Sequence, residues 1–160
     1  MSLDETIHNC YQDDSFTVTC AYIEQIHALH FRARGKITPE NTGIANQWVL
    51  DFLNQHFSYK RPVNFIADVR GINAIGLRSR TLDSAQNLYK DRRLHWFILI
   101  KPQKGGLKFV ADMLAAVATV GMRSRSFNAL EDGLTFLQSA HNPFRLSHVH
   151  IKEPDSHDAT

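Results

Sequence analysis

LHWFILIKPQKGGLKFVADMLAAVATVG, residues 94–121, is the stretch that decides the fold class. It begins with a nearly unbroken apolar run that ends at Ile100, and the lack of alternation predicts a central strand covered on both faces. A Gly-Gly pair then leads into a segment whose apolar residues recur at helical spacing until Gly121. The stretch therefore predicts a buried strand followed by a helix.

The same strand-then-helix unit recurs on the N-terminal side of this stretch. A short apolar run at 63–68 precedes a helical pattern that extends from about 79 to 92. Further upstream, a strand marked at its end by Gly35 precedes Thr38-Pro39-Glu40, a strong helix start. Thr caps free amides there, Pro is preorganised at the first helical position, and Glu favours the positive end of the helix dipole.

On the C-terminal side, residues 123–127 alternate as a strand, and Asn128-Ala129-Leu130-Glu131 resembles a capping box that starts a last helix. Residues 15–34 read as a hairpin. The order predicts an α/β fold with a mixed sheet of about five strands and four helices. We expect residues 15–140 to form this domain, between a polar lead-in at 1–14 and a polar tail at 141–160.

Composition narrows the class of protein. A chain of 160 residues is expected to form one domain. Its net charge of +2 does not by itself indicate nucleic-acid binding. Cys10 and Cys20 make no disulfide framework, and buried thiols are the favoured reading. No apolar run approaches the ~20 residues of a membrane span, and the N-terminus is polar and acidic, so a cytoplasmic location is expected.

Three pieces of the chain carry a resemblance to a known family. They are LHFRARGKIT at 29–38, FIADV at 65–69 and RSFNALEDGL at 125–134. Together with the element order, they resemble the STAS family, which includes sulphate-transporter C-terminal domains and bacterial anti-sigma factor antagonists. The likeness is closest to stand-alone, antagonist-like members of unknown role, and it covers roughly residues 15–140.

This resemblance implies a STAS-like βα superhelix, a role in protein–protein signalling, and often a phosphorylated Ser or Thr. In classical antagonists that residue sits in an Asp-Ser-Ser-Gly-like turn after the Asp-bearing strand. Here the corresponding segment is Ile75-Gly76-Leu77-Arg78-Ser79-Arg80. Ser79 is the one residue that matches the family's turn, because the acidic residue before it and the Gly after it are both missing. Ser79 is the candidate phosphoacceptor, and a plain helix cap is the alternative.

Arginines gather near this candidate. Arg70, Arg78 and Arg80 could form a partner-binding or anion-binding site at one edge of a parallel sheet, or an ordinary solvated rim. Asp68 ends an apolar strand, where carboxylates often bind ligands in α/β proteins. It could equally satisfy loop amides or pair with Arg70, and a structural role of this kind is the favoured interpretation.

Metal and catalytic motifs are weak. His148 and His150 share a strand face, but no Cys or carboxylate cluster completes a ligand set, so neither a metal nor a cofactor is expected. No Gly-rich phosphate fingerprint and no Gly-x-Ser-x-Gly elbow is present, and His27 and His30 have no orienting partner that the sequence identifies.

The sequence therefore predicts a non-enzymatic signalling module that binds a protein, such as a regulator or a kinase-like partner, and that could form a homodimer. The alternative is an α/β domain that binds a small anionic or lipid-like molecule.

Overall fold

The structure is a computed structural model that describes residues 6–75, 83–102 and 106–140. The strands are β1 (Ile7–Gln12), β2 (Phe16–Ile23), β3 (Ala28–Ile37), β4 (Val63–Ile75), β5 (Leu94–Ile100) and β6 (Arg123–Phe127). The helices are the short 3-10 turn η1 (Glu24–Ile26), α1 (Pro39–His56), α2 (Asp83–Tyr89), α3 (Leu107–Thr119) and α4 (Leu130–Ala140).

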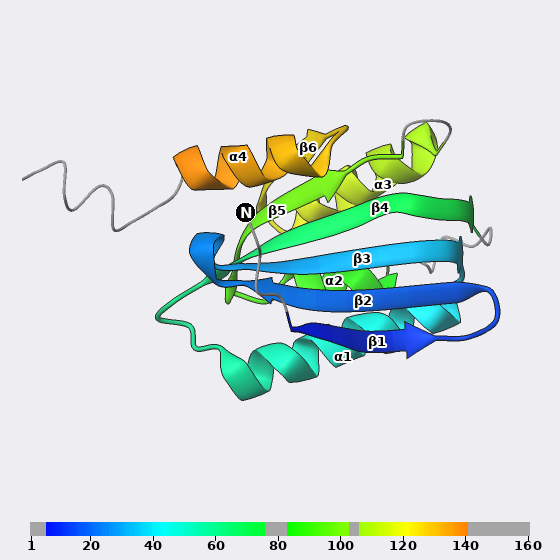
Figure 1. Ribbon diagram of the computed structural model, residues 1–160, viewed down its shortest axis with the longest axis horizontal. Coiled ribbons are helices and arrows are strands. Elements are labelled where there is room, and N and C mark those ends of the chain that lie inside the picture. The colour runs from blue at the N-terminus through cyan, green and yellow to red at the C-terminus, as the bar shows by residue number, and fades with distance from the viewer. Residues whose placement is uncertain (1–5, 76–82, 103–105, 141–160) are drawn as a thin grey trace, which may run out of the picture.

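The strands form a mixed sheet in the order β1-β2-β3-β4-β5-β6 (Figure 1). The first two pairings, β1 with β2 and β2 with β3, are antiparallel, whereas β3, β4, β5 and β6 run parallel to one another. Each parallel neighbour is reached through a helix, as parallel strands require. The predicted α/β class with four helices is confirmed.

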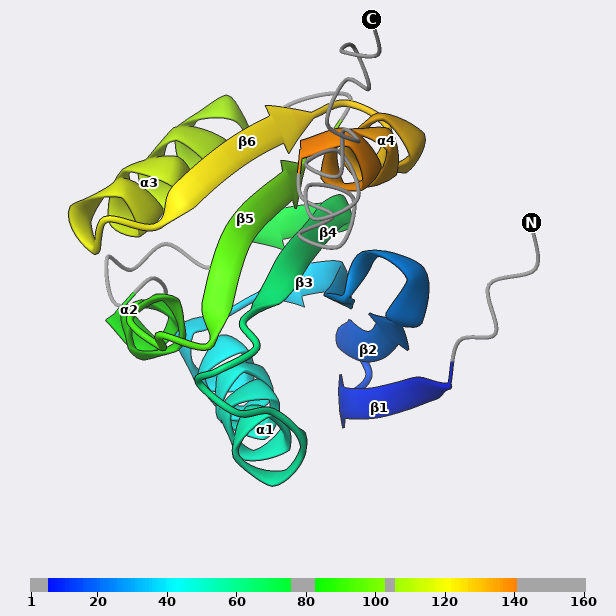
Figure 2. The same cartoon turned by 90° about the vertical axis from the view of Figure 1, so that its left-hand side faces the viewer.

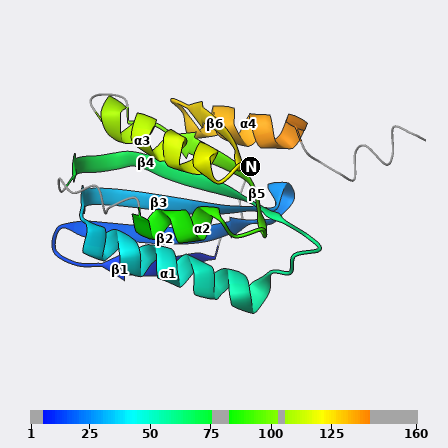
Figure 3. The same cartoon turned by 180° about the vertical axis from the view of Figure 1, so that it is seen from behind.

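Helices cover the two faces of the sheet unequally. Helices α1, α2 and α3 lie on one face, in front of the strands in Figure 3. Helix α4 lies alone on the other face, beside β5 and β6 (Figure 2). The first strands of the sheet therefore have a helix layer on one side only, within the described residues.

The strand count corrects the prediction of about five strands. Residues 7–12, expected to belong to a loose polar lead-in, form β1 and pair with β2. Only Cys10 of this strand is buried, so no apolar pattern marks it in the sequence. Backbone pairing with a neighbour, which needs no particular side chain, is what places β1 in the sheet.

The third and fourth strands are longer than predicted. Gly35 was expected to mark the end of a strand, but β3 continues to Ile37. Similarly, the strand predicted at 63–68 is longer in the structure, because residues 71–75 extend β4 to Ile75. The β3–β4 register shifts twice, between Arg32 and Arg34 and again at Gly35, so these positions are irregularities within paired strands.

The start of α1 confirms the predicted cap. The Thr38 hydroxyl accepts a hydrogen bond from the Asn41 amide at 3.2 Å, and the Thr38 amide donates to the Asn41 side-chain oxygen at 2.9 Å. Pro39 occupies the first helical position. This reciprocal pair satisfies donors that the helix itself leaves free.

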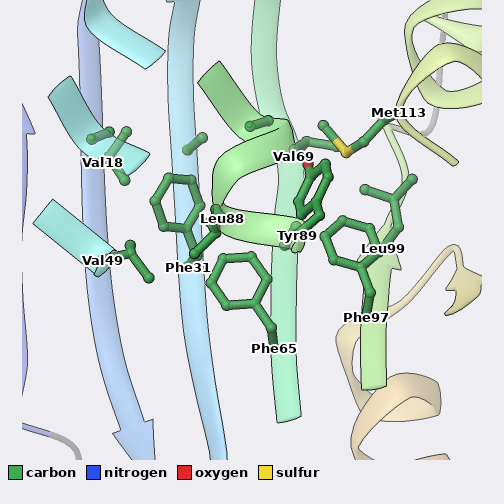
Figure 4. Close-up of a cluster of buried hydrophobic side chains, with 14 of the residues drawn as sticks. Val18, Phe31, Val49, Phe65, Val69, Leu88, Tyr89, Phe97, Leu99 and Met113 are labelled. Carbon is green, nitrogen blue, oxygen red and sulfur yellow. The ribbon is translucent and has the colours of Figure 1, made fainter. Parts of the chain in front are cut away.

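The main core lies between the sheet and helices α1 to α3 (Figure 4). Phe31, Phe65 and Phe97 form a row across β3, β4 and β5, with ring centroids 5.7 and 5.9 Å apart. A smaller apolar cluster on the opposite face joins β4 and β5 to α4 through Ile66, Ile98 and Leu137. The burial of β5 on both faces confirms the central strand predicted from its unbroken apolar run.

Candidate functional site on the uncovered sheet face

The candidate site lies on the same side of the sheet as α4, over β3 and the part of β4 that follows Ile66, and we call this part the uncovered face. Leu29, Phe31 and Ala33 of β3 point into the main core, so His30, Arg32 and Arg34 point to the opposite face. Because Phe65, Ala67 and Val69 of β4 also point into the core, Asp68 faces the same way as the β3 arginines. These side chains form one polar cluster on two adjacent parallel strands.

Asp68 is the centre of this cluster. Its side chain is 3% exposed, and both of its oxygens accept hydrogen bonds from the Arg70 guanidinium, at 2.9 Å from Nε and 2.8 Å from an Nη. The Arg70 backbone amide donates to the same carboxylate at 3.2 Å. Two further groups approach from β3: Nε2 of His30 lies 3.5 Å away and Nε of Arg32 lies 4.0 Å away.

These neighbours keep Asp68 ionised although it is buried. Burial opposes the charged form, but the nearby His30 ring, the hydrogen bonds from Arg70 and the positive charge of Arg70 outweigh it and hold the pKa of Asp68 far below its ordinary value. A structural role for Asp68, with backbone amides or with Arg70, was the interpretation favoured from the sequence, and Asp68 accepts hydrogen bonds from both the amide and the side chain of Arg70. Asp68 therefore orients the Arg70 guanidinium.

The pairing of β4 with β3 is irregular beside Arg70. Asp68 pairs with Arg32, but Gly71 pairs with Arg34, so β4 contains one more residue than β3 across this interval. Gly71 has no side chain at the point where the Arg34 side chain crosses β4, since an added Cβ would lie 2.5 Å from Arg34 Cγ.

The remaining predicted site residues lie elsewhere. Ser79, Arg78 and Arg80 fall outside the described residues, so the structure says nothing of the candidate phosphoacceptor or of its flanking arginines. Arg70, expected in a loop with them, instead belongs to β4. The structure brings Asp68 and Arg70 together, and adds three β3 residues that the sequence interpretation did not assign to a site.

One signal could have found the β3 residues. His30, Arg32 and Arg34 alternate with apolar residues at strand spacing, which predicts that they share a face. The sequence could not reveal that these residues lie beside Asp68. Asp68 is on β4 and becomes a neighbour of His30 and Arg32 only through the parallel pairing of β3 with β4.

Other candidate sites were also compared with the structure. Cys10 and Cys20 are free and buried, in agreement with their interpretation as buried thiols. Within the described residues, no group of three or more His, Cys, Asp or Glu side chains could hold a metal ion, and His148 and His150 lie outside that part of the chain. Among the described helices, none combines the length and apolar character that a membrane crossing needs.

We expect Asp68→Asn to lower the free energy of unfolding by about 2 kcal/mol at neutral pH, because charge-assisted hydrogen bonds contribute about 1.5–3 kcal/mol and Arg70 retains access to water. The pKa of Asp68 is depressed in the folded protein, so its contribution is present above the ordinary value of 3.8 and is lost as the pH falls below it.

Urea unfolding at neutral and acidic pH measures both effects. The difference between the original protein and Asp68→Asn should shrink as the pH falls. Asp112→Asn, the same change at an exposed position of α3, is the matched control and should leave stability unchanged. Equal stability of the two variants at neutral pH would show that Asp68 does not hold the cluster together.

Comparisons with known proteins add little beyond the fold. No family model matches the chain, and no curated protein matches it. Its structure is similar to the crystal structure of an uncharacterized protein from the DUF3478 family with a SpoIIAA-like fold, from Shewanella loihica PV-4. The match has 18% sequence identity and a TM-score of 0.49, and it covers 83% of this chain and 93% of that chain.

The fold named for the Shewanella protein is the one that the STAS resemblance implies for this chain. At this identity and score, the match contributes nothing to the assignment of a site or a function.

Proposed function

We propose that this protein is a non-enzymatic module that binds another protein, and that the partner docks an acidic segment on the uncovered sheet face. The observation that supports this most is the placement of Arg32, Arg34 and Arg70, each at least about one-third exposed, on one face of two adjacent strands. Arginine is suited to carboxylates because its planar fork donates two parallel hydrogen bonds.

The charge balance of the face favours an acidic partner. Asp68 offsets the charge of Arg70, and Glu131 at the start of α4 also acts on Arg70. Arg34 is exposed, and Arg32 is about one-third exposed and lies 4.0 Å from the carboxylate. These two guanidinium groups therefore retain donors for an incoming carboxylate. The sheet fixes the backbone of both residues, so only their side chains must be ordered on binding.

The burial of His30 supports a non-enzymatic role for the cluster. His30 is the group that could act there as a general base, but it is 3% exposed and faces Asp68. A general base must reach the proton that it removes, directly or through one water molecule. At this depth, His30 serves as a neighbour of Asp68 rather than as a group that meets substrate.

Regulation by phosphate at Ser79 remains part of the proposal, as does a homodimer. A phosphate flanked by Arg78 and Arg80 would change the charge presented to a partner. Intact-mass and peptide analysis of the protein from its native host, with and without phosphatase, tests this. Cleavage before Asp68 and Asp83 keeps Ser79 in one peptide, and an unmodified Ser79 under several growth conditions would leave it as a helix cap.

The docking proposal is tested by charge reversal. A partner captured from the native host is purified, and its affinity for this protein is measured by calorimetry. We expect the double variant Arg32→Glu and Arg34→Glu to weaken binding at least about tenfold, because it replaces attraction by repulsion on the docking face. Binding should also weaken as salt rises.

The matched control is the double variant Lys90→Glu and Lys108→Glu, which changes the net charge equally at exposed positions away from the uncovered face. It should bind as the original protein does. Equal weakening by both variants would mean that only overall charge matters, and unchanged binding of the arginine variant would place the interface elsewhere. Either result would overturn docking on this face.

A small-molecule binder is the second candidate function. A groove of about 580 Å³ at the C-terminal end of α1 favours it, since volumes of this size are typical of ligand sites. The apolar cavity under α2 does not favour a lipid-like ligand. Its volume of about 40 Å³ holds roughly three water-sized groups. A thermal-shift screen separates the two functions, because a bound ligand raises the unfolding temperature.

A further inference from the structure

The groove at the end of α1 is formed by segments far apart in the sequence. Tyr22 and His27 come from the end of β2 and the turn into β3, whereas Phe52 and His56 come from the last turns of α1. Gln55 completes the helix side of the groove. The link from α1 to β4 supplies the rest of the lining, which is Phe57, Ser58 and Arg61. The groove therefore exists only because the hairpin and the helix end meet.

Aromatic rings form its walls. The ring of Phe57 lies 5.5 Å from that of Tyr22, 5.8 Å from that of His27 and 6.1 Å from that of Phe52, measured between centroids. Tyr22, Phe52 and Phe57 are all half-buried, so part of each ring faces the groove. Such walls favour a flat apolar ligand, because aromatic rings prefer offset or edge-on contact with one another.

His27 holds the two sides of the groove together. Its Nε2 lies 3.3 Å from the Arg61 carbonyl oxygen, which only accepts, so Nε2 carries the proton. Nδ1 of the neutral ring then accepts a hydrogen bond from the Tyr22 hydroxyl at 2.6 Å. Burial lowers the pKa of His27, with the charge of Arg61 adding to the effect and the bond to the Arg61 carbonyl opposing it, which favours this neutral form.

The backbone of His27 is strained. With φ at 47°, it is the one non-glycine residue of the described chain in the left-handed region. Gly or Asn would adopt this conformation more readily. The interactions with Tyr22 and Arg61 require an imidazole, and strain of this kind is often kept where a site must be held in one shape.

The charge of the groove selects an anion. None of its lining side chains, as far as the described residues form it, is acidic. The Arg61 side chain is exposed, and no carboxylate of the described chain forms an ion pair with it. Glu24 acts on Tyr22 from the neighbouring turn without lining the groove. The single permanent positive charge of Arg61 therefore suits a ligand with one negative charge.

Polar donors stand beside this cation. Ser58, Gln55 and His56 are exposed at the same rim. The end of α1 carries the negative end of the helix dipole, which opposes an anion, so the anionic group needs the positive charge of Arg61. A carboxylate suits this position, because it accepts two parallel bonds from one guanidinium.

We propose that this groove binds a small planar aromatic carboxylate, with the ring against the wall formed by Tyr22, Phe52 and Phe57 and the carboxylate on Arg61. The proposal rests on the second candidate function and is independent of protein docking, since the groove shares no residue with the Asp68 cluster. The occupant is a free small molecule.

Cinnamate is a suitable probe because it combines a flat ring with one carboxylate. It is titrated into the full-length, isotope-labelled protein while backbone amide signals are followed by NMR. We expect saturable shifts confined to residues 22–27 and 52–61. Cinnamyl alcohol, which has the same skeleton without the charge, and acetate, which has no ring, should each bind at least about tenfold more weakly.

Two matched variants test the role of Arg61. Arg61→Gln should weaken cinnamate binding about tenfold through loss of the charge-assisted pair. Lys60→Gln removes the same charge at the adjacent exposed residue, which does not line the groove, and should leave binding unchanged. The Arg32→Glu and Arg34→Glu variant should also bind cinnamate normally, which separates this proposal from docking on the sheet.

Three results would overturn the proposal. They are the absence of saturable shifts at millimolar cinnamate, shifts centred outside the groove, and equal weakening by Arg61→Gln and Lys60→Gln. Equal binding of cinnamate and cinnamyl alcohol would likewise show that the groove takes a ring without selecting its charge, contrary to the role given to Arg61.

Discussion

Replacing Gly35 by alanine is expected to lower the free energy of unfolding by about 4 kcal/mol. Its φ of +97° is unfavourable for any residue with a side chain, at a cost of roughly 1–2 kcal/mol. An added Cβ would also lie 2.0 Å from the Ser15 carbonyl oxygen and 3.1 Å from Cα of Phe16. Backbone atoms cannot turn aside, and overpacking of this kind adds roughly 1–3 kcal/mol.

Gly121→Ala is the matched control for this prediction. Gly121 also has a positive φ, +74°, but an added Cβ would meet no atom within 4 Å. We expect it to cost about 1 kcal/mol, from the backbone conformation alone. Urea unfolding followed by circular dichroism compares the two. Equal losses would mean that β2 and β3 do not approach each other as closely at Gly35 as described.

The second large effect is expected for Phe65→Ala, at about 4 kcal/mol. Phe65 is 2% exposed and stands between Phe31 and Phe97 in the middle of the main core (Figure 4). Truncation loses the transfer free energy of the ring and leaves a void, for which losses of 3–5 kcal/mol are typical. Because Phe65 also lines the existing cavity of about 40 Å³, the new void would join it.

Chemical unfolding again measures this change. Ile44→Ala is the comparison, because Ile44 is a large apolar residue that is 50% exposed on α1 and should cost well under 1 kcal/mol. Phe65→Leu, which keeps most of the volume, should fall between them. A loss for Phe65→Ala no larger than that for Ile44→Ala would contradict the position of Phe65 in the core.

Local signals predicted the elements with strong patterns and missed those without. The apolar run of β5 and the Thr38 cap of α1 were identified because each depends on neighbouring residues alone. Strand β1 was missed because its backbone pairs with β2 while most of its side chains remain outside the core. Gly35 was interpreted as a strand end, although its positive φ serves a close approach within β3.

The candidate sites were less predictable than the fold. Asp68 and Arg70 were named from the sequence, and their pairing is local. The contributions of His30 and Arg32 depend on the parallel register of β3 with β4, to which no short-range pattern refers. The contact of Tyr22 with His27 is short in sequence, but the groove also needs the end of α1 and Arg61.

By itself, the sequence determined the α/β class, the order of helices and strands, and the helix start at Thr38, because periodicity and caps act within a few residues. The tertiary structure alone decided that β1 joins the sheet, that β3 and β4 present their arginines around Asp68 on an uncovered face, and that His27 closes a groove with Arg61. These features arise from strand register and from the meeting of distant segments, which depend on how the whole chain packs.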